Sequence, residues 1–194
     1  MSRYGLVSTA PSMEHIGVAC RELDFGFEVL SVISGAAFKA PRHDLKDLKI
    51  DLLDSEFPLL EYVSSVAYII SAAETSNSIA RFDGIKFGYR PEEYSSFEDI
   101  YVKSRTESFT FETKLFTLVG MMALTKDKYG PYFDKSLRAR RLMADSLSGI
   151  LERYDAVMSP VDGLKYTALP NLTGDPAIAM PGGFQIIVKK GALT

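Results

Sequence analysis

The sequence is poor in the residues from which disulfides and metal centres are built. Cys20 is the only cysteine, and His15 and His43 are the only histidines. A single cysteine excludes an internal disulfide, and such scarcity is typical of a reducing compartment. Two distant histidines and one cysteine argue against a Cys/His zinc site. We therefore expect neither a metal nor a cofactor.

Long apolar runs and a basic excess are also missing. No window approaches the roughly 18 uninterrupted apolar residues of a membrane span, and the N-terminus lacks the apolar run of a signal peptide. We therefore expect a soluble, cytoplasmic protein with no membrane partner. The formal net charge of −3 argues against a broad nucleic-acid-binding face. The densest basic cluster, Arg138, Arg140 and Arg141, is interpreted as a solvated helix face.

Motifs of self-contained catalytic or phosphate sites do not occur either. No serine stands three residues before a lysine, so the sequence holds no S-x-x-K pair, and it holds no G-x-S-x-G elbow. The P-loop pattern is missing, which argues against an autonomous phosphate site. Gly182-Gly183 is the only pair of adjacent glycines, which excludes a Gly/Ser-rich loop.

What is present predicts an α/β protein. Hydrophobic residues make up 46% of the chain, which is typical of a globular core. Apolar residues at helical spacing predict helices over 22–34, 58–79, 96–105, 112–124 and 132–154. Short apolar runs predict strands over 13–20, 48–53, 155–159, 177–180 and 184–188. Because no linker or repeat divides the chain, we expect a single domain over 1–194.

Capping and breaking residues refine these boundaries. Gly35 is expected to stop the first helix, and Ser96 to cap the third, with Asp99 in a weaker capping box. The apolar stripe of 132–154 is interpreted as core rather than as a cofactor pocket. The chain breaks at Asp83-Gly84, where glycine accepts a positive φ. Arg81 and Asp83 either pair and fix this turn, the interpretation we favour, or present one charge to a ligand.

Several blocks together resemble the amidase signature family. They are SRYGLVSTAPSMEHIG at 2–17, AETSNSIARFDGIKFGYR at 73–90, SRTESF at 104–109, YDAVMSPV at 154–161 and LPNLTGDPAIAMPGGFQII at 169–187. These blocks follow the order of the family and extend over nearly the whole chain. Within the family, the pattern is most similar to the A subunits of glutamyl-tRNA(Gln) amidotransferases.

This resemblance implies a mixed sheet flanked by helices, that is, a shortened amidase-signature fold. It also implies amide or glutamine hydrolysis by a Ser–cis-Ser–Lys triad, with ammonia passed to a partner subunit. In the family, the lysine and both serines precede the SRYGL segment. The chain is therefore expected to correspond to the C-terminal part of the fold without that catalytic segment, and no catalytic residue is assigned.

The resemblance also marks a remnant substrate pocket. Glu14 and His15 fall where the family has aspartate and glutamine, and His15 is either a pH-sensitive polar contact or a drifted loop residue. Tyr68 lies beside Ala67, the position of a substrate-holding tyrosine. A substrate-binding arginine falls at Phe116, and an acidic position falls near Leu164. We assign five residues to this remnant pocket: Glu14, His15, Tyr68, Arg81 and Asp83.

Three hypotheses follow. The chain is a noncatalytic amidase-like protein, or one half of a split enzyme completed by a partner chain with the triad, or an accessory subunit that meets tRNA only indirectly. Between Ile50 and Pro58 the family has a further helix and strand that this chain does not have room for. Such a loss exposes sheet edge and apolar surface, so we expect a protein partner, a homo-oligomer or marginal stability.

Overall fold

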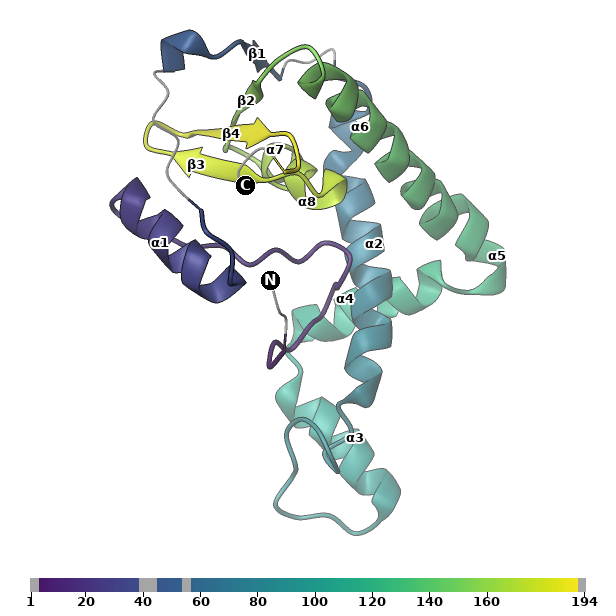
Figure 1. Ribbon diagram of the computed structural model, residues 1–194. Helices are drawn as coiled ribbons and strands as arrows, with labels where there is room; N and C mark the ends of the chain where they lie inside the picture. The colour runs from purple at the N-terminus through teal and green to yellow at the C-terminus, as the bar shows by residue number, and fades with distance from the viewer. Residues whose placement is uncertain (1–3, 39–44, 54–56, 192–194) are drawn as a thin grey trace. The chain divides into compact units, whose positions relative to one another are not determined.

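The computed structural model describes residues 4–38, 45–53 and 57–191 (Figure 1). The chain groups into two compact units. The first comprises the described residues of 1–7, 13–65 and 138–194, and the second comprises 8–12 and 66–137. Each unit is described separately below.

The first unit is built on a four-stranded mixed sheet with the order β1-β2-β4-β3. The strands are β1 (Ile50–Leu52), β2 (Ala156–Pro160), β3 (Ala177–Met180) and β4 (Phe184–Val188). β1 runs parallel to β2, whereas β4 is antiparallel to both β2 and β3. The predicted α/β class with a mixed sheet is therefore confirmed.

The β3–β4 hairpin turns at Gly182 and Gly183. Their φ angles are 105° and 83°, in the region that favours glycine. Register places Val157 of β2 opposite Ile187 of β4, and both side chains are buried. The central strands thus supply the sheet's part of the core.

Helices and short helical turns complete the first unit. They are α1 (Leu23–Ser34), η1 (Leu45–Asp47), η2 (Leu60–Tyr62), the first residues of α2 (Val63–Ser78), most of α6 (Lys135–Leu151), α7 (Leu164–Thr167) and α8 (Leu169–Thr173). α1 ends at Gly35 with a φ of 70°, as predicted. On α6, Met143 and Leu147 are fully buried, which confirms the core interpretation of that stripe.

The second unit is helical. It contains the rest of α2, η3 (Ile79–Arg81), α3 (Phe97–Ser108), α4 (Phe111–Ala123), α5 (Lys126–Lys128) and the π-helical turn η4 (Tyr129–Asp134). Figure 1 shows the segment between η3 and α3 as a long loop beside α3. Ile70 and Ala72 of α2 are fully buried and supply the core of this unit.

Two expectations about elements are wrong. The strand predicted over 13–20 does not form, and most of these residues are exposed, since Gly17 interrupts the apolar run and the sheet is built from other segments. α6 begins at Lys135 rather than near Tyr132, because the chain around Pro131 adopts the π-helical turn first. Residues 39–44 lie outside the described residues, which resume at η1.

Candidate functional site

Tyr68, the candidate on α2, packs against Phe116 of α4. The ring centroids lie 4.9 Å apart with an interplanar angle of 78°, an edge-to-face arrangement. One turn further along both helices, Gly120 touches the backbone of Ala72. Both contacts therefore join α4 to the same stretch of α2. The side chain at 116 therefore serves helix packing.

The turn after η3 holds the candidates Arg81 and Asp83. Arg81 donates from Nε to the carbonyl of Ser78 at 3.0 Å, and Asp83 Oδ1 accepts from the N–H groups of Ile85 and Lys86 at 2.9 and 3.3 Å. The predicted Arg81–Asp83 salt bridge is wrong, because each side chain bonds to backbone instead. The Ile85 N–H is the main cause that lowers the pKa of Asp83 below its ordinary value.

Arg105 of α3 holds the same turn from the other side. It donates from Nη2 to the carbonyl of Ala80 at 3.0 Å and from Nε to that of Phe82 at 3.5 Å. Its guanidinium also lies over the Tyr101 ring, 4.2 Å from the centroid. Gly84, with a φ of 73°, lies so close to Ser104 that a side chain would collide with it. Residues 104–109 thus hold the turn at 80–84 in place through hydrogen bonds and close packing. We did not predict this role from the sequence.

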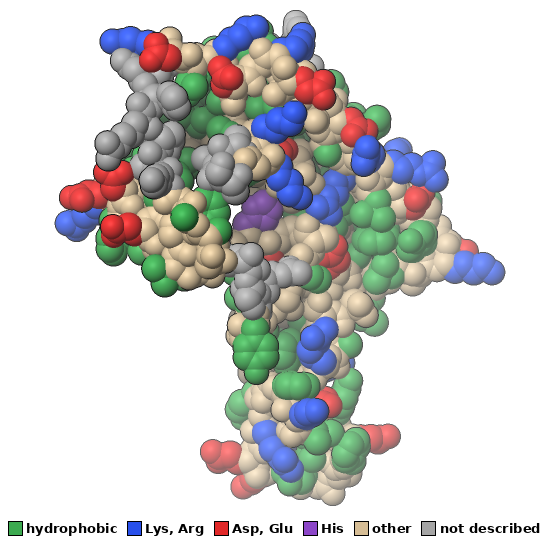
Figure 2. All heavy atoms as spheres, viewed as in Figure 1, with side chains coloured by type: hydrophobic (Ala, Val, Ile, Leu, Met, Phe, Trp, Pro, Cys, Tyr) green, Lys and Arg blue, Asp and Glu red, His purple; other side chains and the backbone are tan. Residues whose placement is uncertain are grey.

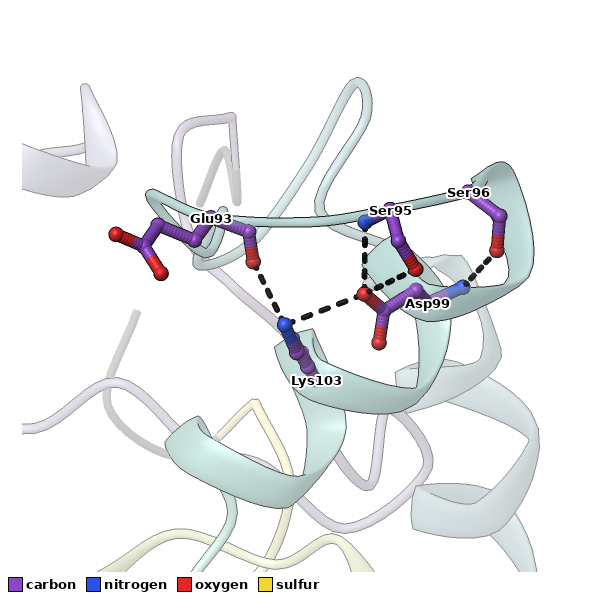
Figure 3. Close-up of polar contacts among 5 residues, drawn as sticks. All are labelled: Glu93, Ser95, Ser96, Asp99 and Lys103. Carbon is purple, nitrogen blue, oxygen red and sulfur yellow. Dashed lines mark hydrogen bonds and ion pairs between the residues drawn. The ribbon is translucent and has the colours of Figure 1, made fainter.

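The start of α3 is fixed by the expected cap and by a small polar network (Figure 3). The Ser96 hydroxyl accepts from the Asp99 N–H at 3.1 Å, and Asp99 Oδ2 accepts from the N–H of Ser95 at 2.8 Å. Lys103 Nζ lies 3.2 Å from the same oxygen and donates to the Glu93 carbonyl at 3.0 Å. The Ser95 N–H first, and then Lys103, lower the pKa of Asp99. The cap is confirmed, with Ser95 rather than Ser96 as the reciprocal donor.

In the first unit, Glu14 and His15 follow a segment that is tied to α8. Asn171 of α8 donates from Nδ2 to the Met13 carbonyl at 2.8 Å. Glu14 is half-buried and His15 is exposed. This bond joins the first and the last of the motif blocks that the resemblance rests on.

A buried polar contact at the sheet joins the last block, 169–187, to the block at 154–161. Gln185 of β4 donates from Nε2 to the Ser159 hydroxyl on β2 at 3.0 Å and to the Tyr166 carbonyl at 2.9 Å. Gln185 is 5% exposed and Ser159 is 2% exposed. The low dielectric around such a pair makes each lost partner costly. We did not single out either residue from the sequence.

The candidate residues are therefore divided between the units. Glu14 and His15 belong to the first unit, and Tyr68, Arg81 and Asp83 belong to the second. Within the second unit, Tyr68 contacts an aromatic ring whereas Arg81 and Asp83 bond to the backbone of their own turn. These contacts shape the chain and do not pair a nucleophile with a base. The remnant pocket stays a prediction.

The described residues hold neither a metal-binding cluster nor a membrane span. Across 4–38, 45–53 and 57–191, no three His, Cys, Asp or Glu side chains form a group that could hold a metal ion. Of the helices that the structure describes, none is long and apolar enough to cross a membrane.

The fold resembles solved amidases. The chain superimposes on the A subunit of the glutamyl-tRNA(Gln) amidotransferase from Thermotoga maritima with a TM-score of 0.56 and 17% identity, covering 99% of this chain and 53% of that one. A second structure, described as an amidase, gives a TM-score of 0.67 at 16% identity, with 97% and 53% covered. At such identities the likeness shows the fold: an α/β arrangement shared with about half of an amidase-signature enzyme.

Sequence comparison gives the family. Residues 35–181 match the family model described as Amidase, and the chain belongs to that family. It is 29% identical over 247 residues to the A subunit of the glutamyl-tRNA(Gln) amidotransferase from Lachnoclostridium phytofermentans, covering 94% of this chain and 50% of the relative. The corresponding protein of Clostridium botulinum is 37% identical over 145 residues, with 65% and 30% covered. The chain therefore spans half or less of the length of these curated relatives.

Proposed function

We propose that this chain is an amidase-like protein that corresponds to the C-terminal part of the family fold and does not hydrolyse amides by itself. The edge-to-face pair of Tyr68 and Phe116 carries this proposal. By the resemblance, Phe116 stands where glutamine-using relatives have a substrate-binding arginine. An aromatic ring cannot make the charge-assisted hydrogen bonds that hold an amino-acid substrate.

The other candidate groups support the same proposal. The side chains of Arg81 and Asp83 bond to the backbone of their own turn, so their charges stabilise local structure. The sequence holds no S-x-x-K pair or G-x-S-x-G elbow that could replace the family's triad. We therefore propose that the chain acts by binding through the retained fold rather than by hydrolysis.

Hydrolysis assays test the proposal directly. The purified chain is incubated with L-glutamine and separately with a simple anilide, and released ammonia or aniline is followed. We expect no release above the buffer rate. A full-length amidase of the family serves as the positive control. Sustained turnover that co-purifies with the chain through two orthogonal columns would overturn the proposal.

A split enzyme is the second candidate, because the chain spans about half the length of relatives such as the Lachnoclostridium protein. In this version a separate chain supplies the Ser–Ser–Lys segment and completes the sheet. β1 and β3 are the outer strands of the described sheet, and Leu52 on β1 is 63% exposed. Unpaired outer strands are templates for further pairing.

The native mass of the chain, isolated from its source with peptide identification of co-eluting proteins, separates the two candidates. A complex with a protein that carries the triad, active on glutamine or an amide, would favour the split enzyme. A lone chain or homo-oligomer without activity would favour the noncatalytic protein. A role beside tRNA would then be indirect, and we expect no tRNA binding even at low ionic strength, since the net charge is −3.

A further inference from the structure

The two outer strands of the sheet differ in how their free edges are finished. At the end of β1, the Leu53 N–H donates to the Met158 carbonyl of β2 at 2.8 Å, so the neighbouring Leu52 N–H points away from β2. The Asp51 carboxylate occupies this outward group, because its Oδ1 accepts from the Leu52 N–H at 3.0 Å. Charged side chains are one of the devices that protect a sheet edge, so the edge at β1 is partly blocked.

β3 carries no such block along its outer edge. The Val188 N–H of β4 donates to the Pro176 carbonyl at 3.0 Å, so every second residue from Pro176 onward bonds to β4. The residues between them, Ala177 and Ala179, point their N–H and C=O groups outward. Among the residues that the structure describes, none bonds to these outward groups. Both alanines are exposed, and the strand Ala-Ile-Ala-Met is uncharged, so the edge is open to a further strand.

We propose that β3 pairs antiparallel with β3 of a second copy of the chain, which would join the two sheets into one. In this register Ala177 lies opposite Ala179 of the other copy, and each such pair exchanges two hydrogen bonds. The two pairs form four hydrogen bonds and satisfy the outward groups of both strands. Between them, Ile178 meets Ile178 of the other copy in an apolar cross-strand pair. The strand is therefore its own complement.

The flanking residues favour a second copy over an unrelated strand. Pro176 and Pro181 have no N–H, so they confine the donors of the open edge to residues 177–180. A second copy has its donors confined in the same way, and the two short edges match end to end. The nearest charge, Asp175, falls opposite Pro181 of the other copy, so like charges do not meet across the pair.

The rest of the described surface does not favour another occupant. Basic and acidic side chains are mixed across the face drawn in Figure 2, so that face does not select a partner of one charge. The proposed pair also closes, because a twofold contact uses both β3 edges, and we expect a dimer and not a fibre. The inference does not depend on the proposed function, because the pairing requires neither a substrate nor the catalytic segment.

Sedimentation over a concentration series tests the dimer. We expect the natural chain to pass from monomer to dimer as its concentration rises. Two double variants test the pairing: Ala177→Lys with Ala179→Lys sets lysine opposite lysine, whereas Ala177→Lys with Ala179→Glu sets lysine opposite glutamate. Both positions are exposed in the single chain, so both variants should fold, which circular dichroism checks.

The charge signs then decide the outcome. Opposite charges across a strand pair attract and like charges repel, and the contact occurs twice in the dimer. We therefore expect the variant with two lysines to associate at least about tenfold more weakly than the variant with lysine and glutamate. Equal association of the two variants would overturn the proposal. So would a natural chain that stays monomeric at all concentrations up to about 500 µM.

Disulfide trapping tests the register. In a Cys20→Ser background, which removes the only cysteine, Ile178→Cys and Ala179→Cys are made as separate proteins. The two copies of position 178 face each other with Cα atoms about 4.5 Å apart, within the reach of a disulfide. The two copies of position 179 lie diagonally and beyond that reach. Under mild oxidation we expect a linked dimer from Ile178→Cys and little from Ala179→Cys. Equal linking of both proteins would show a parallel pair and overturn the proposed register.

Discussion

Gly120 of α4 lies so close to the carbonyl group of Ala72 on α2 that a side chain at position 120 would collide with it. Both residues are buried, and the obstacle is backbone rather than a flexible side chain. Glycine is therefore required here by the approach of two helices and not by its own conformation, since the residue is helical.

The first prediction is that Gly120→Ala destabilises the protein by about 2 kcal/mol or more, because overpacking forces the two helices apart. Urea denaturation followed by circular dichroism measures the loss. The matched control is Gly149→Ala in α6, where an added Cβ meets nothing within 4 Å. There the better helix propensity of alanine should raise stability by about 0.5–1 kcal/mol. Equal effects at the two positions would contradict the close helix contact.

The second prediction concerns acid stability. Asp99 has a pKa below its ordinary value of 3.8, chiefly because its carboxylate accepts from the Ser95 N–H. A lowered folded pKa contributes stability that is fully present above the unfolded pKa and is lost as the pH falls through the folded one. We therefore expect unfolding free energy to drop below about pH 4 less steeply in Asp99→Asn than in the natural chain.

The control for Asp99 leaves the main hydrogen bond in place. Ser95→Ala removes the hydroxyl that donates to Asp99 at 3.1 Å and keeps the backbone N–H. Its pH profile should therefore stay close to that of the natural chain. Asp83 also has a lowered pKa, and it contributes to the acid profile in the same direction in the natural chain and in Asp99→Asn. An unchanged acid profile in Asp99→Asn would contradict the assigned role of this carboxylate.

Local sequence rules predicted elements well where the structure depends on neighbours in the chain. Ser96 caps α3 and Gly35 ends α1, because both roles are set by residues within one helical turn. The rules failed where the formation of an element depends on segments that are distant in the sequence. The apolar run at 13–20 reads as a strand, but a strand requires another strand beside it, and the sheet is built without this segment.

The candidate site shows the same division. The break at Gly84 was predicted from the residue itself, whereas the bonding of Arg81 to the Ser78 carbonyl could not be told from pairing with Asp83. Arg105 and Gln185 join motif blocks through contacts between segments distant in sequence, and no local pattern marks them. Both residues lie inside the blocks that carry the family resemblance. That position was the signal in the sequence that could have pointed to them.

The third prediction is that Gln185→Leu destabilises the protein by about 1–3 kcal/mol although the size and burial of the side chain are kept. The change leaves the buried Ser159 hydroxyl and the Tyr166 carbonyl without the amide that donates to them at 3.0 and 2.9 Å. Thermal unfolding measures the loss. The double variant Gln185→Leu with Ser159→Ala should recover part of it, because one of the two orphaned groups is then removed. No recovery would contradict the pairing.

The fourth prediction separates a structural from a substrate-facing role at Phe116. Tyr68→Leu and Phe116→Leu are combined in a double-mutant cycle, and we expect a coupling energy of about 0.5–1.5 kcal/mol, the range of edge-to-face pairs. Leucine keeps much of the apolar area, so the cycle isolates the ring contact. Chemical denaturation of the four proteins supplies the free energies.

Coupling in that range would mean that Phe116 is held by α2, so that the position where relatives are expected to contact a charged substrate instead joins two helices. Coupling below about 0.3 kcal/mol, within the usual error of additivity, would mean that the rings do not hold each other. Position 116 would then be free to face a ligand, and the strongest support for a noncatalytic protein would be lost. The cycle thus tests the proposed function through stability alone, with no assumption about which amide the family member would cleave.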